Sequence, residues 1–217
     1  MKIISLSFFL LALTFLYSCE KTDFNYPPGT VGISKIVYFP SVSINGDRLI
    51  IMDQGGAFTD PGATAILNGQ SVQYTTTGTV DPSTPGVYGL QYTATNPEGY
   101  TASDWRTVVI IGSDVAGNDF SGTYLRSVTG ITSTWTKDSS GVYSVENPGG
   151  ASVGAGLHVI AVNYTGTMIS IPHQISPDYG EVSSSDETYS LTPPPPTYSW
   201  VFHAGGYGTS LRTFVKQ

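Results

Sequence analysis

The sequence predicts an all-β chain of two modules, a small β-sandwich followed by a second antiparallel β-barrel or sandwich. Three observations predict this class. The 25 Gly and 14 Pro residues interrupt most ten-residue stretches. Beyond residue 30, no long stretch repeats apolar residues at helical spacing. Short alternating or β-branched runs recur between turn signals such as Asn45-Gly46 and Asp60-Pro61-Gly62.

The first eighteen residues read as a signal sequence. Met1 and Lys2 precede the almost wholly apolar run Ile3–Tyr17, which is too short to cross a bilayer comfortably. The run ends in Leu16-Tyr17-Ser18-Cys19, which resembles a bacterial lipobox. That resemblance implies cleavage after Ser18 and lipidation of Cys19, so that a lipid anchor would hold the protein on a membrane. The alternative is an ordinary signal peptide in which Cys19, the only cysteine, occurs by chance.

Residues 19–30 are polar and Pro-rich, which is typical of an extended tether. We place the first module at 31–112, a polar linker at 113–119 and the second module at 120–217. The strands expected in the first module are Ser34–Phe39, Arg48–Met52, Ser71–Thr77, Gly86–Asn96 and Arg106–Ile111. Those expected in the second are Gly122–Val128, Ile131–Lys137, Gly141–Glu146, Leu157–Tyr164, Thr167–Ile171, Glu187–Leu191, Tyr198–Ala204 and Ser210–Lys216.

Three blocks of the first module carry a family resemblance. They are Gly56–Ala65 (GAFTDPGATA), Pro85–Asn96 with its PGVY and YTATN segments, and Arg106–Ile110 (RTVVI). In this order and spacing they resemble the bacterial Ig-like domain named after a pesticidal crystal protein, which is common in surface lipoproteins of Bacteroidota. The resemblance implies an Ig-like β-sandwich that acts mostly as a spacer. It implies architecture and not chemistry.

The second module has two weaker resemblances. The opening Phe120–Tyr124 segment, together with Arg212 in the last expected strand, is similar to the lipocalin pattern of an opening G-x-W and a closing Arg, with Tyr124 in place of the Trp. More of the module, including Gly141-Val142-Tyr143 and the stretch 198–209, looks like the C-terminal domain that is paired with that Ig-like domain in Bacteroidota lipoproteins.

The composition disfavours nucleic acid as a partner. The net charge is −7, only 12% of residues are charged, and no basic stripe is present to neutralise phosphates. His158, His173 and His203 lack metal-ligand spacing, so no metal and no cofactor is predicted. The carboxylates Asp178, Glu181, Asp186 and Glu187 lack the calcium-loop pattern and are interpreted as a solvated acidic loop.

One segment matches a catalytic motif letter for letter. Gly150–Gly154 (GASVG) fits the G-x-S-x-G nucleophile elbow around Ser152, with His158 four residues beyond the motif. An elbow requires a strand before the serine and a helix after it, and neither is predicted here. We therefore expect a chance match and no enzyme activity. Gly205–Thr209 lacks the ending of a phosphate loop and is interpreted as a hairpin turn.

Aromatic residues are the remaining candidates for binding. The second module is rich in Tyr and Trp, and exposed rings stack on the C–H faces of sugars. Tyr179, Tyr189, Trp200 and Tyr207 are the predicted ligand-contact residues. Alternation in the expected strand around Trp200 places Tyr198, Trp200 and Phe202 on one face, which is interpreted as the core face.

The sequence thus predicts a lipid-anchored protein of the outer membrane, exposed at the cell surface. The favoured function is accessory glycan binding in polysaccharide capture, with polysaccharide and other outer-membrane glycan-uptake proteins as partners. The alternative is a structural or adhesive envelope protein that binds other proteins, and the third hypothesis is a hydrolase that uses Ser152.

Overall fold

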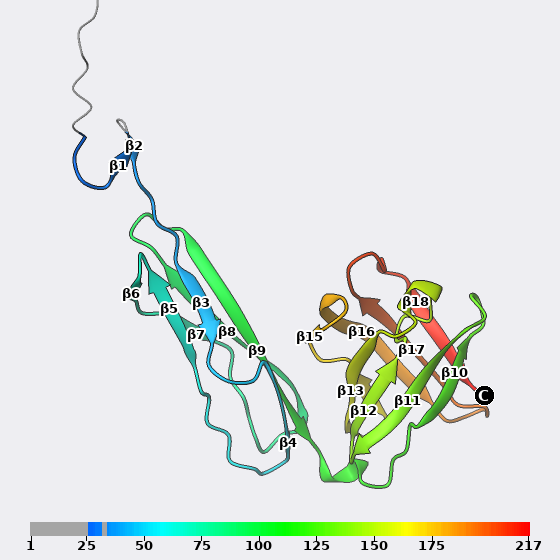
Figure 1. The fold of residues 1–217 in the computed structure, drawn as a ribbon. Helices are drawn as coiled ribbons and strands as arrows, with labels where there is room; N and C mark the ends of the chain where they lie inside the picture. Colours follow the sequence, from blue (N-terminus) through cyan, green and yellow to red (C-terminus); the bar gives the residue numbers. More distant parts are fainter. Residues whose placement is uncertain (1–25, 32–33) are drawn as a thin grey trace, which may run out of the picture. The chain divides into compact units, whose positions relative to one another are not determined.

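The computed structural model describes residues 26–31 and 34–217 (Figure 1). The chain consists of two compact units, one that ends at Tyr38 and one that runs from Phe39 to Gln217. In the first unit, β1 (Thr30–Val31) and β2 (Ser34–Lys35) form a short antiparallel hairpin. The expected strand Ser34–Phe39 is therefore mostly absent. The predicted signal segment 1–18 and Cys19 lie outside the described residues. Within the described residues, none lies in an apolar helix long enough to span a bilayer.

The first part of the larger unit is a two-sheet sandwich. One sheet has the order β3-β5-β6 and the other β4-β9-β8-β7, with β4 parallel to β9 and the remaining pairs antiparallel. The strands are β3 (Ser41–Ile44), β4 (Leu49–Asp53), β5 (Ala63–Leu67), β6 (Gln70–Ser71), β7 (Thr75–Thr77), β8 (Gly86–Thr95) and β9 (Thr101–Ile111). Two of these, β3 and β5, were not expected from the sequence. They consist of short segments rich in Ser, Thr and Ala, whose strand conformation depends on their pairing with each other.

A buried arginine, Arg106, connects several segments of the sandwich through its side chain. Arg106 on β9 is fully buried and forms an ion pair with Asp60. Its guanidinium also donates to the Tyr92 hydroxyl at 3.0 Å and to the carbonyls of Asn45 and Asp47. Around it, alternate residues of β8 point inward and pack with Ala63 of β5. Arg106 and Asp60 both belong to the sequence blocks that carry the Ig-like resemblance. They stabilise the core as a pair, because a buried charge requires such partners.

The second part is one curled antiparallel sheet of nine strands, in the order β14-β13-β12-β11-β10-β18-β17-β16-β15. It follows a single 3₁₀ turn, η2 (Ser113–Val115), in the predicted linker. The strands are β10 (Gly122–Arg126), β11 (Ile131–Ser139), β12 (Val142–Glu146), β13 (His158–Thr165), β14 (Met168–Ser170), β15 (Gln174–Ser176), β16 (Gly180–Ser190), β17 (Thr197–His203) and β18 (Leu211–Lys216). The all-β class predicted from the sequence is confirmed.

The sheet curls until its β14 end reaches β16, beside the other end, so the module has the form of a barrel and not of a two-sheet stack. The Ser184 amide on β16 donates to the carbonyl of Ile171, just after β14, at 3.0 Å. Further along, the Gln174 side chain seals the seam against β13. Its Oε1 accepts from the Ile160 amide at 2.9 Å, and its Nε2 donates to the Ile160 carbonyl at 2.7 Å. A side-chain amide thus replaces a strand partner at this point of the barrel wall.

Aromatic rings fill the barrel. The indole rings of Trp135 and Trp200 are stacked with centroids 5.4 Å apart, and Tyr198 lies 4.6 Å from Phe214 in a parallel arrangement. All four residues are buried. The interior is therefore a packed core.

The two residues that carry the lipocalin resemblance, Tyr124 and Arg212, have different neighbours. Lys216 lies over the Tyr124 ring, with its Nζ 5.8 Å from the ring centroid. Arg212 is buried elsewhere, where it donates to the carbonyls of Gly149 and Tyr207.

The acidic stretch is the main error in the strand prediction. The structure places Glu181 and Asp186 within the long strand β16 and not in a loop, and Glu187 lies in the same strand, where the expected strand Glu187–Leu191 begins. Only Val182 is buried among the residues of its first half, so this half carries no alternating apolar pattern. Strand conformation comes from pairing with β15 and β17, which the local sequence does not encode.

Candidate binding surfaces

The structure does not bring the four predicted ligand-contact residues together. Trp200 is fully buried, and its indole N–H donates to the Pro148 carbonyl at 2.9 Å. The expectation that this ring joins an exposed surface is wrong, because its neighbours on the barrel interior cover it. Tyr179 immediately precedes β16, whereas Tyr189 lies near the other end of that strand and packs edge-on against Phe120 at 4.3 Å. The two tyrosines that flank the acidic stretch therefore face different ends of the barrel.

Only Tyr179 and Tyr207 meet, with ring centroids 5.7 Å apart in an edge-to-face arrangement. Tyr179 is half-buried, and its hydroxyl donates to the Val153 carbonyl. Tyr207 is only 9% exposed, which contradicts the expectation of an open ring at a glycine turn. Burial raises the pKa of Tyr207 to about 12, with a further contribution from Tyr179. The pair is part of the wall at this end of the barrel, and it does not offer a free ring face.

The segment that matches the serine motif closes this end of the barrel. It lies between β12 and β13, and Ser152 begins the single 3₁₀ turn η3 (Ser152–Gly154). Arg212 and Arg126 donate to the Gly149 carbonyl, and the Thr129 hydroxyl donates to the Gly150 carbonyl at 2.9 Å. The element that follows is strand β13, so the serine does not sit at the start of a helix as an elbow requires.

Packing explains the glycines of this segment. A Cβ atom on Gly149 would lie 2.1 Å from the Tyr207 ring, and one on Gly150 would lie 2.7 Å from Phe214. A Cβ atom on Gly154 would lie 2.3 Å from the Tyr207 hydroxyl. Gly150 also has a φ of +54°. The glycine spacing of GASVG thus has a structural cause, and a fluorophosphonate probe is expected to leave Ser152 unlabelled.

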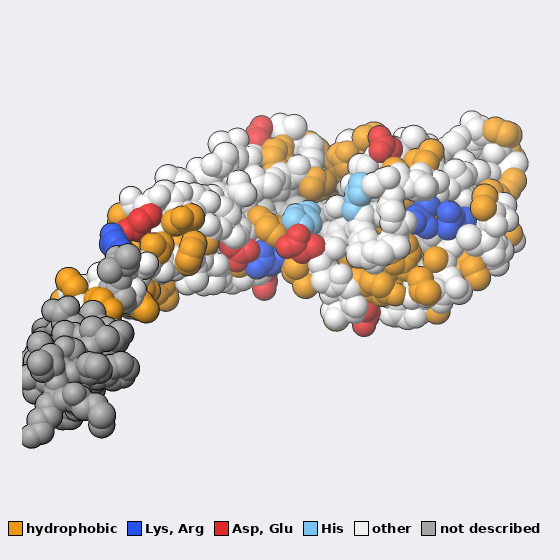
Figure 2. All heavy atoms as spheres, turned by 90° about the horizontal axis from the view of Figure 1, so that it is seen from above, with side chains coloured by type: hydrophobic (Ala, Val, Ile, Leu, Met, Phe, Trp, Pro, Cys, Tyr) orange, Lys and Arg blue, Asp and Glu red, His pale blue; other side chains and the backbone are white. Residues whose placement is uncertain are grey.

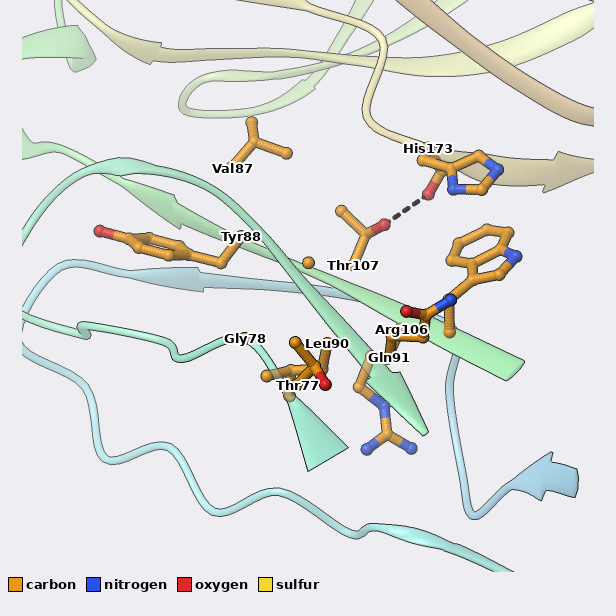
Figure 3. Close-up of a pocket in the computed structure, with 11 residues that line it drawn as sticks. Thr77, Gly78, Val87, Tyr88, Leu90, Gln91, Arg106, Thr107 and His173 are labelled. Atoms are coloured by element: carbon orange, nitrogen blue, oxygen red, sulfur yellow. Dashed lines mark hydrogen bonds between the residues drawn. The ribbon is translucent and has the colours of Figure 1, made fainter. Parts of the chain in front are cut away.

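A groove of about 410 Å³ lies where the sandwich meets the turn that carries His173 (Figure 3). Val87, Gly89 and Gln91 on β8 point outward along its floor, and Thr77 of β7 pairs with Gln91. A side chain on Gly89 would meet nothing within 4 Å, so the centre of the floor is open. The exposed surface of the lining is chiefly apolar, and the Gln91 amide and the Thr77 hydroxyl are among its polar groups.

A stack of three side chains borders this groove. The Trp105 ring lies against His173, with centroids 3.5 Å apart, and the Arg48 guanidinium lies 4.6 Å from the Trp105 centroid. The Thr107 hydroxyl donates to the His173 carbonyl at 2.7 Å (Figure 3). Both aromatic groups were missed as site residues, because no local pattern connects two positions so distant in the sequence. His173 was considered only as a metal ligand.

Asp104 fixes the arginine of this stack. It accepts from Arg48 Nη2 at 3.1 Å and from the backbone amides of Trp105 and Ile44 at 2.9 and 3.2 Å. Burial opposes ionisation of Asp104, but these hydrogen bonds outweigh it and hold its pKa below the usual value. The carboxylate therefore keeps Arg48 over the Trp105 ring at neutral pH.

A second hollow, of about 220 Å³, is also lined by His173, together with Glu181, Ser183 and His203. His173 Nε2 is 3.3 Å from a Glu181 carboxylate oxygen, and His203 Nε2 is 2.8 Å from the Ser185 hydroxyl. Among the described residues, no three such side chains are arranged to hold a metal ion. Charged side chains are sparse on the face shown in Figure 2.

Two comparisons with known proteins gave matches, one over most of the chain and one over the sandwich. No curated protein matches the chain. Among solved structures, the chain is similar to the crystal structure of the lipoprotein BT2262 from Bacteroides thetaiotaomicron, with 24% identity, a TM-score of 0.38, and coverage of 82% of this chain and 100% of that one. Residues 42–110 match the family model described as "Bacterial surface protein, Ig-like domain". This match confirms that the first module is Ig-like.

Proposed function

We propose that this chain is a binding protein of the bacterial cell envelope that captures polysaccharide as an accessory component. The Ig-like match over residues 42–110 supports a location in the cell envelope, and the predicted lipidation at Cys19 supports attachment to a membrane. In the proposal that membrane is the outer membrane, with the chain on its outer side. In this proposal the chain binds its ligand without transforming it. Other outer-membrane glycan-uptake proteins are then its partners.

The observation that carries the proposal is the groove beside His173. Its volume of about 410 Å³ falls within the range of roughly 300–1,000 Å³ that is typical of small-molecule sites. A pyranose ring offers apolar C–H faces and hydroxyl groups together. Val87, which points outward, and the open backbone at Gly89 can contact the apolar C–H faces of the sugar. The Gln91 amide and the Thr77 hydroxyl can form hydrogen bonds with its hydroxyl groups. This site replaces the predicted cluster in the barrel, where two of the four rings are buried.

Affinity electrophoresis and titration calorimetry against a broad polysaccharide panel test the proposal. We expect at least one polysaccharide to bind, and the Gly89→Val variant to lose that binding because the new side chain occupies the groove, where a Cβ atom at this position meets nothing within 4 Å. Thr213→Val, at an exposed position on β18, is the matched control and should bind normally. Normal binding by Gly89→Val would exclude the groove, and the absence of any binding on the panel would exclude glycan capture.

The chiefly apolar lining of the groove favours a second candidate, a structural or adhesive envelope protein that binds another protein. A partner that co-purifies with the wild-type chain, is lost with Gly89→Val and is not displaced by sugars would support it. Displacement of the partner by a polysaccharide of the panel would instead support glycan capture.

A further inference from the structure

An exposed aromatic pair marks one end of the Ig-like sandwich. Phe39 and Tyr100 are 63% and 51% exposed, and their ring centroids are 5.0 Å apart. Ser41, two residues after Phe39, pairs with Ile66, which is itself 41% exposed on the outer face of β5. Three large apolar side chains from separate segments therefore share this end and remain open to solvent.

The Tyr100 ring is held in place by a well-ordered turn. Asn96 is buried, and its side-chain oxygen accepts from the Tyr100 amide at 2.7 Å. The Asn96 amide donates to the Tyr100 carbonyl at 2.9 Å, and Gly99 completes the turn with a φ of +90°. The exposed ring thus projects from a fixed backbone, so little conformational entropy would be lost when it contacts a surface.

The path of the chain attaches the N-terminal segment at this end. Phe39 is the first residue of the larger unit, so the N-terminal segment is attached at this end. Cys19 precedes Phe39 by twenty residues, and the apolar run Ile3–Tyr17 lies just before it. Twenty residues span at most about 70 Å when fully extended. Whether the apolar run stays or acyl chains replace it at Cys19, a membrane on the N-terminal side is within reach.

We propose that Phe39, Ile66 and Tyr100 form a membrane-contact tip that lies in the headgroup region of the bilayer to which the N-terminus is attached. Aromatic rings with one polar end favour this interfacial layer. Glu98 in the same turn and the net charge of −7 disfavour anionic lipid. Zwitterionic phosphatidylcholine or phosphatidylethanolamine is therefore the matching surface. The proposal depends on membrane attachment and is independent of the groove.

Fluorescence quenching by brominated phospholipids tests this tip. The Phe39→Trp variant of the full chain is bound to phosphatidylcholine vesicles that carry bromine just below the headgroups. We expect the bilayer to quench most of the emission that the new tryptophan adds to that of Trp105, Trp135 and Trp200. Leu211→Trp, at a 55% exposed position on β18 of the barrel, is the matched control and should keep its added emission.

Two results would overturn the proposal, namely unquenched emission from Phe39→Trp and equal quenching of both variants. The chain used is one whose acylation at Cys19 has been verified by mass spectrometry, so that it is anchored on the vesicles. Glycan binding by the same preparation should be unchanged, so failure of the tip and failure of the proposed function are distinguished.

Discussion

The seam of the barrel gives the sharpest stability prediction. Gln174 is 6% exposed and makes three hydrogen bonds, two to the backbone of Ile160 and one, at 3.0 Å, from its Nε2 to the Pro172 carbonyl. At about 0.5–1.5 kcal/mol for each net hydrogen bond, Gln174→Ala should lower the free energy of unfolding by about 1.5–4.5 kcal/mol. The loss should fall in the upper half of this range if water does not reach the Ile160 backbone.

Urea denaturation followed by tryptophan fluorescence measures this loss, because Trp135 and Trp200 report on the barrel core. Native-state hydrogen exchange at the Ile160 amide gives a local readout, and its protection should fall in the variant. Gln70→Ala, at an exposed position on β6, is the control and should change stability by less than about 0.5 kcal/mol. A loss below about 0.5 kcal/mol for Gln174→Ala, with unchanged exchange at Ile160, would refute the side-chain seam.

Three further substitutions test other parts of the fold. Gly149→Ala should cost about 1–3 kcal/mol in thermal unfolding, because its methyl group would enter a tyrosine ring, whereas Gly205→Ala should be neutral. Arg106→Met should lower the free energy of unfolding by about 2–4 kcal/mol. This is less than the loss expected for a fully buried ion pair, because the side chain of its partner Asp60 is 28% exposed. A loss below about 1 kcal/mol would contradict the role of Arg106 in stabilising the core. The lowered pKa of Asp104 stabilises the fold above the unfolded value of about 3.9, and this contribution disappears as the pH falls through the lower folded value. Asp104→Asn should therefore reduce the loss of stability below about pH 4 in an acid titration, and an unchanged acid limb would count against it.

Strands with strong local patterns could be predicted from the sequence. The alternation around Trp200 correctly places Tyr198, Trp200 and Phe202 in the core, because a strand with one buried face carries its large rings on every second position. The same face was also used to nominate Trp200 for binding, and the two roles are incompatible. Sequence position showed that Tyr207 follows glycines, but it did not show that Gly149 would pack against its ring.

The groove and the seam depend on contacts between distant segments. Trp105 and His173 come from different modules and have no common motif, and Gln174 lies in a three-residue strand with no recognisable pattern. In the sequence, a glutamine whose side chain forms hydrogen bonds with a strand backbone cannot be distinguished from a surface glutamine. The first half of β16 is similar, since its serines and carboxylates are strand residues only because neighbours on both sides supply hydrogen-bond partners. Such features are set by tertiary pairing and not by local propensity.

The stacked indole and phenol rings at the centre of the barrel have an evolutionary consequence. Recognition in a hollow barrel can change by altering residues that line its interior, but here such changes would first disturb folding. Relatives with different binding preferences should therefore differ at outward strand positions and in the connecting loops. The summed side-chain volume at positions 135, 198, 200 and 214 should stay nearly constant among them.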